Sequence, residues 1–184
     1  MKNNITLPVP ELSRPLKVDR IPLGGVEEKI VASPLERQGL AERFGLIELP
    51  RFEAFLNVDR AEGAMIAVTG TILAEVVQQC VVTLEPVPSQ VRDTINVLYA
   101  PPHLIKNDRE GPLGDIGEAE APEPIENGVI DLGELASQHL ATALDPYPRK
   151  EGAELGRVEA NGPSATAEIT PMNPFALLKQ SDRS

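Results

Sequence analysis

The alternation of side chains in residues 64–78 constrains this chain more than any other feature. One set of alternate residues is small and aliphatic, and the set between them is half polar. This period of two predicts a β-strand with one buried face. Gly70, in the middle of the run, indicates a bend, a bulge or a close backbone approach. A second alternating run follows at residues 91–99. We therefore expect an antiparallel pair of strands, with Cys80 and its neighbours at the turning point.

Further extended runs are predicted on both sides of this turning point. Residues 16–21 and 26–32 flank the tetrapeptide Pro-Leu-Gly-Gly, whose glycines permit a positive φ, so we expect these two runs to form a hairpin. Residues 46–58 follow as a strand with one apolar parity. Beyond the turning point, Pro86 and Pro88 are expected to stop regular pairing.

A short helix is predicted after the second extended run. Ser33 and Glu36 have the spacing of a capping box, and Pro34 fits the first helical position. Gly45 suits the exit. The inner face is expected to comprise Leu35, Leu40, Ala41 and Phe44.

Residues 130–144 have the clearest helical pattern in the chain. Asp131 is placed to cap this helix, and Asp145-Pro146 ends it. Apolar residues recur at helical spacing and form a continuous stripe that we expect to lie on the sheet. His139 falls beside the stripe, where a hydrogen-bonded histidine at the edge of the core is expected.

Two segments resemble loops. Residues 101–127 combine prolines, glycines and seven carboxylates, which is typical of a flexible insert, and residues 149–171 are similarly poor in apolar anchors. We therefore expect a core at residues 1–148 with a flexible acidic insert at about 101–127, and a mobile tail at residues 149–184. The tail ends in an apolar segment that predicts docking onto the core or onto a partner, and its candidate docking residues are Asn173, Pro174, Phe175 and Leu178.

These elements indicate an α+β fold in a single domain. We expect an antiparallel, strongly twisted or partly closed β-sheet packed by two main helices, with long flexible loops and a short C-terminal helix. Aromatic residues make up only 3% of the chain, so the core is expected to be aliphatic.

Composition favours a cytoplasmic protein with no membrane span. No window approaches 18 uninterrupted apolar residues, the N-terminus lacks a signal-peptide core, and one cysteine cannot form an intramolecular disulfide. The net charge of −11 comes mostly from residues 105–184. Because such a surface repels a phosphate backbone, contact with RNA is expected to be indirect or limited to a patch in the N-terminal half.

No catalytic or cofactor motif is present. The sequence lacks the phosphate-binding, dinucleotide-binding, nucleophile-elbow and zinc-protease patterns, and no pair of carboxylates has the spacing of an acid and a base. His103 and His139 lie in different segments, and a pair of either with Cys80 is left open. The valines around Cys80 predict a buried thiol with a raised pKa and little reactivity. We assign no catalytic residue, metal ligand or cofactor.

The turning point carries a resemblance to a known family. Gly70 and the run from Gln79 to Pro86 fit the pattern G-x-x-x-A…Q-x-C-x-x-x-L-E-P-V, and this pattern resembles the YceD family of large ribosomal RNA subunit accumulation proteins. Two later stretches, GVIDLGELASQHLATALDPYPR and NPFALL, match in the same order. The residues that form the candidate recognition corner are Gly70, Gln79, Cys80, Thr83, Leu84, Glu85 and Pro86.

Membership of this family implies a non-enzymatic factor that supports accumulation of large-subunit (23S) rRNA and ribosome assembly. Protein contact with a ribosomal protein or an assembly factor is the expected mechanism, and the oligomeric state is left open. The alternatives are a small metal- or RNA-binding module, or a hydrolase or nuclease centred on Cys80. Many relatives carry C-x-x-C at this turn, whereas Thr83 stands here in place of the second cysteine, so a metal role in those relatives does not carry over.

Overall fold

The computed structural model describes residues 10–105 and 121–154 of the 184-residue chain. The main helices are α1 (Pro34–Phe44) and α2 (Leu132–Ala143), and three short 3-10 helices are η1 (Val18–Arg20), η2 (Glu62–Ala64) and η3 (Pro102–Leu104). The strands are β1 (Pro15–Lys17), β2 (Val26–Val31), β3 (Glu48–Arg60), β4 (Ile66–Gln79), β5 (Pro86–Ala100), β6 (Glu123–Pro124) and β7 (Val129–Asp131).

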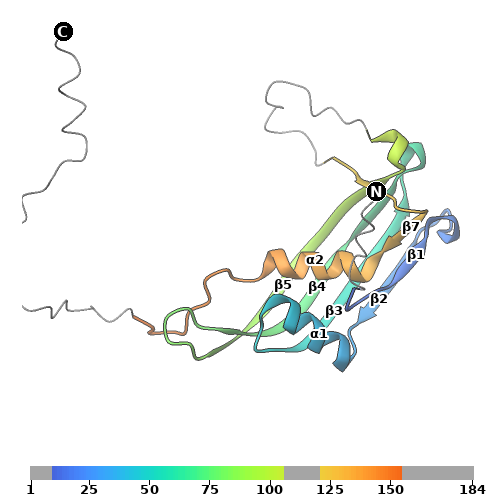
Figure 1. Cartoon of the computed structure of the whole chain (residues 1–184). Coiled ribbons are helices and arrows are strands. Elements are labelled where there is room, and N and C mark those ends of the chain that lie inside the picture. Colours follow the sequence, from blue (N-terminus) through green and yellow to red (C-terminus); the bar gives the residue numbers. More distant parts are fainter. Residues whose placement is uncertain (1–9, 106–120, 155–184) are drawn as a thin grey trace, which may run out of the picture. The chain divides into compact units, whose positions relative to one another are not determined.

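A five-stranded sheet in the order β2-β3-β4-β5-β6 forms the centre of the fold. Adjacent strands within this sheet are antiparallel, except that β5 and β6 run parallel. Figure 1 shows α1 and α2 lying along the same face of this sheet, where α1 packs on β3 and α2 packs on β5 and β4. The α+β prediction is confirmed. The partly closed alternative is wrong, because β2 and β6 lie at opposite edges of an open sheet.

The alternation in residues 64–78 forms β4, as predicted. The side chains on the inner face of β4 are buried under the helices, and they are Ile66, Val68, Ile72, Ala74 and Val76. Gly70 lies on this same face, opposite Leu56 of β3. A Cβ atom built on Gly70 would lie 2.1 Å from the carbonyl oxygen of Phe55, so the predicted close backbone approach is present.

β5 begins earlier than the sequence indicated. Pro86 pairs with Gln79 and Pro88 pairs with Val77, so neither proline stops pairing with β4. Proline is tolerated where its missing N–H would point away from the sheet. Within the described residues β6 pairs only with Tyr99 and Ala100, so the prolines occupy an edge where no neighbouring strand requires their N–H.

The predicted hairpin between residues 16–21 and 26–32 is wrong. β1 instead pairs with β7 in a separate two-stranded sheet, and β2 pairs with β3. Gly25, with φ of 75°, does make the expected turn, and its N–H donates to the carbonyl of Pro22. The chain therefore reverses locally, but each strand pairs with a partner that is distant in sequence.

Both main helices begin at the predicted caps. Ser33 and Glu36 form a capping box on α1, and the left-handed Gly45 ends it. The inner face of α1 is smaller than predicted, because Leu40 and Ala41 are buried whereas Leu35 is 81% exposed. α2 buries its apolar stripe, and Asp131 caps its N-terminus.

The described part of the acidic insert is structured at both ends. Residues 102–104 form η3, Glu123 and Pro124 form β6, and the side chain of Ile125 is buried. The described chain up to Ala153 belongs to one compact unit. The predicted boundary at residue 148 stays a prediction, and the C-terminal helix and the docking residues 173–178 lie outside the described residues. No helix in the described ranges has the length and hydrophobicity needed to cross a membrane.

Candidate functional site

The turn between β4 and β5 is closed by backbone hydrogen bonds around Cys80. The N–H of Cys80 donates to the carbonyl of Glu85 at 2.9 Å, and the N–H of Leu84 donates to the carbonyl of Cys80 at 3.0 Å. The side-chain amide of Gln79 donates to the carbonyl of Leu84 at 3.3 Å. These contacts bring the predicted recognition residues from Gln79 to Pro86 together in one compact turn.

The sulfur of Cys80 is the acceptor at the centre of this turn. Backbone N–H groups of Val82, Thr83 and Lys150 each lie 3.4 Å from Sγ. Hydrogen bonding to the side chain of Thr83, and then donation by the backbone of Lys150, lowers the pKa of the thiol to about 6. Desolvation acts in the opposite direction and is smaller. The predicted raised pKa is therefore wrong, because valine neighbours in sequence do not reveal the donors that the folded backbone aims at the sulfur.

The segment that follows α2 packs against this turn. Pro148 accepts a hydrogen bond from the N–H of Val81 at 2.9 Å, and Asp145 accepts one from the side chain of Gln78 at 2.9 Å. Lys150 forms an ion pair with Glu85, with 2.9 Å between Nζ and Oε1. We call residues 78–86 and 145–150 together the Cys80 corner.

Apolar side chains project outward from the Cys80 corner. Leu84 is 66% exposed, Val81 is 47% exposed and Tyr147 is 71% exposed, although Cys80 itself has no exposed surface. Leu84 also adopts a left-handed backbone conformation, with φ of 62°, which residues with a Cβ atom seldom occupy. Strained backbone of this kind persists where surrounding contacts enforce it, and it clusters at functional sites.

Gly70 does not belong to this corner. It lies in the middle of β4, opposite Leu56 and Ile95 of the neighbouring strands. Because a side chain there would meet the backbone of β3, Gly70 is explained by strand packing.

The contacts of Thr83 and His139 bear on the alternatives that the sequence left open. In the described ranges, no three side chains of the metal-binding types gather as a metal ion requires. The hydroxyl of Thr83 accepts a hydrogen bond from the N–H of Glu85 at 3.4 Å. His139 pairs with Asp93, with 3.0 Å between Nδ1 and Oδ2, as expected for a histidine at the edge of the core. The Cys80–His pair that the sequence left open is absent from the described contacts of the sulfur.

A second feature was not predicted from the sequence. A cavity of about 1020 Å³ lies between the start of α2, the end of β5 and the segment before β1, and we call it the acidic cleft. Its charged lining residues are Glu11, Arg43, Glu123, Glu126, Asp131 and Glu134. These residues come from separated parts of the chain, so no local pattern could have revealed the cleft.

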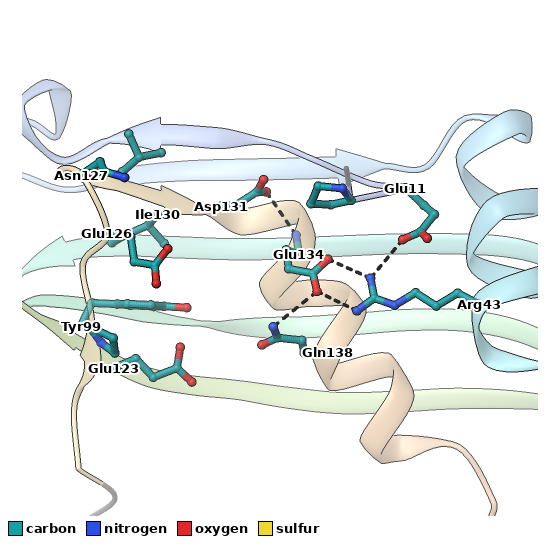
Figure 2. A pocket seen from close by; sticks show the side chains of 13 residues that line it. Glu11, Arg43, Tyr99, Glu123, Glu126, Asn127, Ile130, Asp131, Glu134 and Gln138 are labelled. Atoms are coloured by element: carbon teal, nitrogen blue, oxygen red, sulfur yellow. Dashed lines mark hydrogen bonds and ion pairs between the residues drawn. The ribbon is translucent and has the colours of Figure 1, made fainter. Parts of the chain in front are cut away.

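The one guanidinium in the lining of the acidic cleft is held by two of its carboxylates. Figure 2 shows Arg43 reaching Glu134 through both terminal nitrogens, at 2.8 and 2.9 Å, and Glu11 at 3.0 Å. Tyr99, only 7% exposed, lies at the opposite side with Glu123 beside it. Burial raises the pKa of Tyr99 well above its usual value, and the charge of Glu123 adds to this effect.

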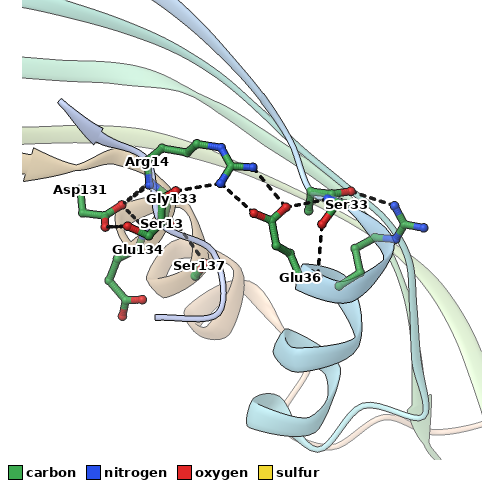
Figure 3. Close-up of polar contacts among 10 residues, drawn as sticks. Ser13, Arg14, Ser33, Glu36, Asp131, Gly133, Glu134 and Ser137 are labelled. Carbon is green, nitrogen blue, oxygen red and sulfur yellow. Dashed lines mark hydrogen bonds and ion pairs between the residues drawn. The ribbon is translucent and has the colours of Figure 1, made fainter. Parts of the chain in front are cut away.

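Asp131 has a structural role on the wall of the acidic cleft. Its Oδ1 atom accepts from the backbone N–H groups of Gly133 at 3.0 Å and Glu134 at 3.2 Å, which caps α2. The same carboxylate accepts from the N–H of Arg14 at 2.7 Å and the hydroxyl of Ser13 at 2.5 Å (Figure 3). Asp131 therefore fixes the segment before β1 to the start of α2.

The fold and the Cys80 corner define an α+β protein with an open sheet and a cysteine-braced apolar turn at one end. The family model described as large ribosomal RNA subunit accumulation protein YceD matches residues 68–180. This match covers more than half of the chain, so the chain belongs to the YceD family. No curated protein and no solved structure matches it.

Proposed function

We propose that this protein supports the accumulation of large-subunit rRNA without catalysing a reaction, by binding a ribosomal protein or an assembly factor. The Cys80 corner is the proposed contact surface. The observation that carries this proposal is the exposure of Leu84, by 66%, on a turn that hydrogen bonds to a buried sulfur hold rigid. The family to which the chain belongs supplies the link to large-subunit rRNA.

A rigid apolar projection is well suited to protein contact. Binding energy in protein interfaces concentrates in a few side chains that fill pockets of the partner, and a side chain that is already ordered loses less entropy on binding. Val81 and Tyr147 extend the apolar surface beside Leu84, and the Lys150–Glu85 pair supplies a charged rim. The arrangement of an apolar centre and a polar rim is typical of such interfaces.

The charge of the chain favours a basic protein as the partner. At a net charge of −11, long-range attraction speeds the encounter with a basic surface and opposes the approach of free RNA. Ribosomal proteins as a class match this requirement. We therefore propose that the protein contacts another protein and that any association with rRNA is indirect.

A pull-down from cell lysate, with and without ribonuclease, tests this proposal. Leu84→Asp is expected to abolish capture of ribosomal proteins or assembly factors, because it places a charge at the centre of the proposed contact. Leu23→Asp is the matched control, since Leu23 is 94% exposed in the turn before β2 and outside the Cys80 corner. Equal capture by wild type and Leu84→Asp, or capture that ribonuclease removes completely, would exclude the protein-contact mechanism at this corner.

The apolar tail segment is proposed as a second docking element. Asn173, Pro174, Phe175 and Leu178 are expected to contact either the core or a partner. Phe175→Ala with Leu178→Ala separates these outcomes: lower thermal stability of the isolated protein indicates docking on the core, and loss of capture at unchanged stability indicates a partner. If both properties are unchanged, the tail has no docking role.

A role of the acidic insert can be tested without damage to the core. Because β6 and the buried Ile125 belong to the fold, a deletion should be limited to residues 106–120. Weaker capture of basic partners after this deletion would support an acidic docking arm, and unchanged capture would remove the arm from the proposal.

A further inference from the structure

We infer that two copies of this chain associate by exchanging their N-terminal segments, so that residues 10–21 of each copy occupy the groove between α1 and α2 of the other. We call this segment the N-terminal strap, and it includes β1 and η1. The inference does not depend on the proposed function, because the strap lies against α1, α2 and β7, which are not parts of the Cys80 corner.

The N-terminal strap lies between the two main helices. The guanidinium of Arg14 donates to both carboxylate oxygens of Glu36 on α1, at 2.7 and 3.1 Å. The backbone N–H of Arg14 donates at 2.7 Å to Asp131, the N-cap residue of α2 (Figure 3). Leu12 has no exposed surface and belongs to the core. The groove therefore accepts an extended segment that carries a leucine and, two residues later, an arginine.

Two glycines shape this groove to the strap. A Cβ atom built on Gly39 of α1 would lie 2.9 Å from Cγ of Glu11, and one built on Gly133 of α2 would lie 2.7 Å from the carbonyl oxygen of Leu12. Gly39 stands in the middle of α1, where glycine costs about 1 kcal/mol relative to alanine. Because the groove fits the sequence of the strap itself, the occupant that it favours from outside is the strap of a second copy.

The strap can leave its groove without disruption of the main sheet. Within the described residues β1 pairs only with β7, over three residues of each strand and in a separate sheet. A two-stranded pair of this kind is marginally stable in water by itself. The Arg14–Glu36 and Arg43–Glu11 ion pairs are partly solvated, so each contributes little. Opening of the strap should therefore require less free energy than opening of the five-stranded sheet.

The turn of residues 22–25 is suited to act as the hinge. Leu23 is 94% exposed, and nothing lies within 4 Å of a Cβ atom built on Gly24. When the turn opens, it loses the hydrogen bond of 3.1 Å from the N–H of Gly25 to the carbonyl of Pro22. The hinge therefore opens with the loss of little packing.

Exchange changes the copy that makes each contact but keeps the contact itself. The guanidinium of Arg60, for example, donates to the carbonyls of Val18 at 3.0 Å and Ile21 at 2.9 Å, and in the exchanged dimer it donates to the same atoms of the other copy. Exchange of identical elements is for this reason a low-cost route to a dimer. The fraction of dimer is expected to rise with chain concentration and with any shortening of the hinge.

Two complementary charge variants of the full chain test the exchange. Arg14→Glu sets two carboxylates against each other, and Glu36→Arg sets two guanidiniums against each other, so neither variant alone can form the ion pair. Exchange between the two variants restores one pair of opposite charges in each groove. After the variants are unfolded in urea and refolded together, native mass spectrometry is expected to show about tenfold more heterodimer than either homodimer.

A variant with both changes in one chain is the matched control. Arg14→Glu with Glu36→Arg restores the ion pair within the chain and should form no more dimer than the wild type. Adding Leu12→Asp to the Arg14→Glu chain removes the apolar anchor of its strap and should reduce the heterodimer. Monomers alone in the refolded mixture would overturn the inference. A heterodimer that Leu12→Asp leaves unchanged would also overturn it, because the copies would then meet elsewhere.

Deletion of Leu23 and Gly24 tests the hinge. The shortened connection cannot make the turn at Gly25, so the strap can reach its contacts only on a second copy, and light scattering is expected to show mainly dimer. A monomeric deletion variant with the thermal stability of the wild type would contradict the exchange. Adding Leu84→Asp to the deletion should leave the dimer intact, so the exchange and the proposed contact at the Cys80 corner are distinguishable.

Discussion

The backbone N–H of Lys150 donates a hydrogen bond to the sulfur of Cys80, with 3.4 Å between the two heavy atoms. Cys80 directly follows β4, whereas Lys150 lies beyond the end of α2. One sulfur atom therefore joins the β4–β5 turn to the segment that leaves the helix. Because the donors to this sulfur lower the pKa of the thiol to about 6, the strength of the connection depends on pH.

Cys80→Ser is expected to remove a pH-dependent part of the stability. An unfolded cysteine ionises near pH 8.5, so a folded pKa of about 6 means that the unfolded chain binds more protons between these values. The free energy of unfolding of the wild type should therefore rise with pH over this window, and it should decline as the pH falls through about 6. Serine does not ionise in this range. Urea unfolding from about pH 5 to about pH 9 measures the difference, and parallel profiles for the two proteins would contradict it.

Gly70→Ala is expected to destabilise the sheet strongly. A Cβ atom at this position would lie 2.1 Å from the carbonyl oxygen of Phe55, and the backbone of β3 must move to accept it. Overpacking of this kind costs about 3 kcal/mol, close to the upper end of its usual range. Gly24→Ala is the control, because nothing lies within 4 Å of its Cβ position. Thermal unfolding should show a large decrease in Tm for the first variant and little change for the second.

The Arg14–Glu36 ion pair is expected to weaken on acidification. Hydrogen bonding to Arg14 is the largest cause that lowers the pKa of Glu36 to about 2, and the N-cap Ser33 adds to it. The pair therefore contributes stability at pH values above about 4.5 that is lost as the pH falls towards 2. Because both side chains are partly solvated, we expect Glu36→Gln to cost less than about 1 kcal/mol at neutral pH. Glu36→Ala should cost more, since glutamine can still complete the capping box and alanine cannot. Equal losses in the two variants would assign no role to the capping box.

Local patterns in the sequence predict a large part of this fold. The alternation that forms β4, the Ser33–Glu36 capping box and the Asp131 cap each depend on residues close together in the chain. The pairing of strands that are distant in the chain leaves no local pattern in the sequence. The chain turns at Gly25 as predicted, but β1 pairs with β7, and Asp131 at the end of β7 also binds Ser13 and Arg14 just before β1.

In the candidate sites too, local features were predicted from the sequence, and contacts between distant segments were not. The sequence located the Cys80 turn, because the position of these residues between two alternating runs is a local signal. It did not predict that Lys150 donates to the sulfur, and the direction of the pKa shift was wrong for that reason. The acidic cleft was missed entirely, since Glu11, Arg43 and Glu123 meet only after the sheet and both helices are assembled.

Asp131 is expected to be the most sensitive charged position in the described structure. Asp131→Ala removes the acceptor for the N–H groups of Gly133 and Glu134 and for the N–H of Arg14, and leaves these donors without a protein partner. Loss of a helix N-cap costs about 1 kcal/mol, and each buried donor left unsatisfied adds about 1 kcal/mol or more. We therefore expect a loss of about 3 kcal/mol in urea unfolding. Asp131→Asn keeps one carbonyl oxygen in place and should cost about 1 kcal/mol.

Hydrogen exchange shows whether the loss follows this mechanism. If Asp131 fixes the segment before β1 to α2, Asp131→Ala should speed exchange of the amides in β1 and at the start of α2, and leave the amides of β4 less affected. Gly133→Ala should have a similar local effect, because its Cβ atom would lie 2.7 Å from the carbonyl oxygen of Leu12. Uniform acceleration across β4 and β1 would instead mean that the contact supports the whole fold, and that the two-stranded sheet does not open separately.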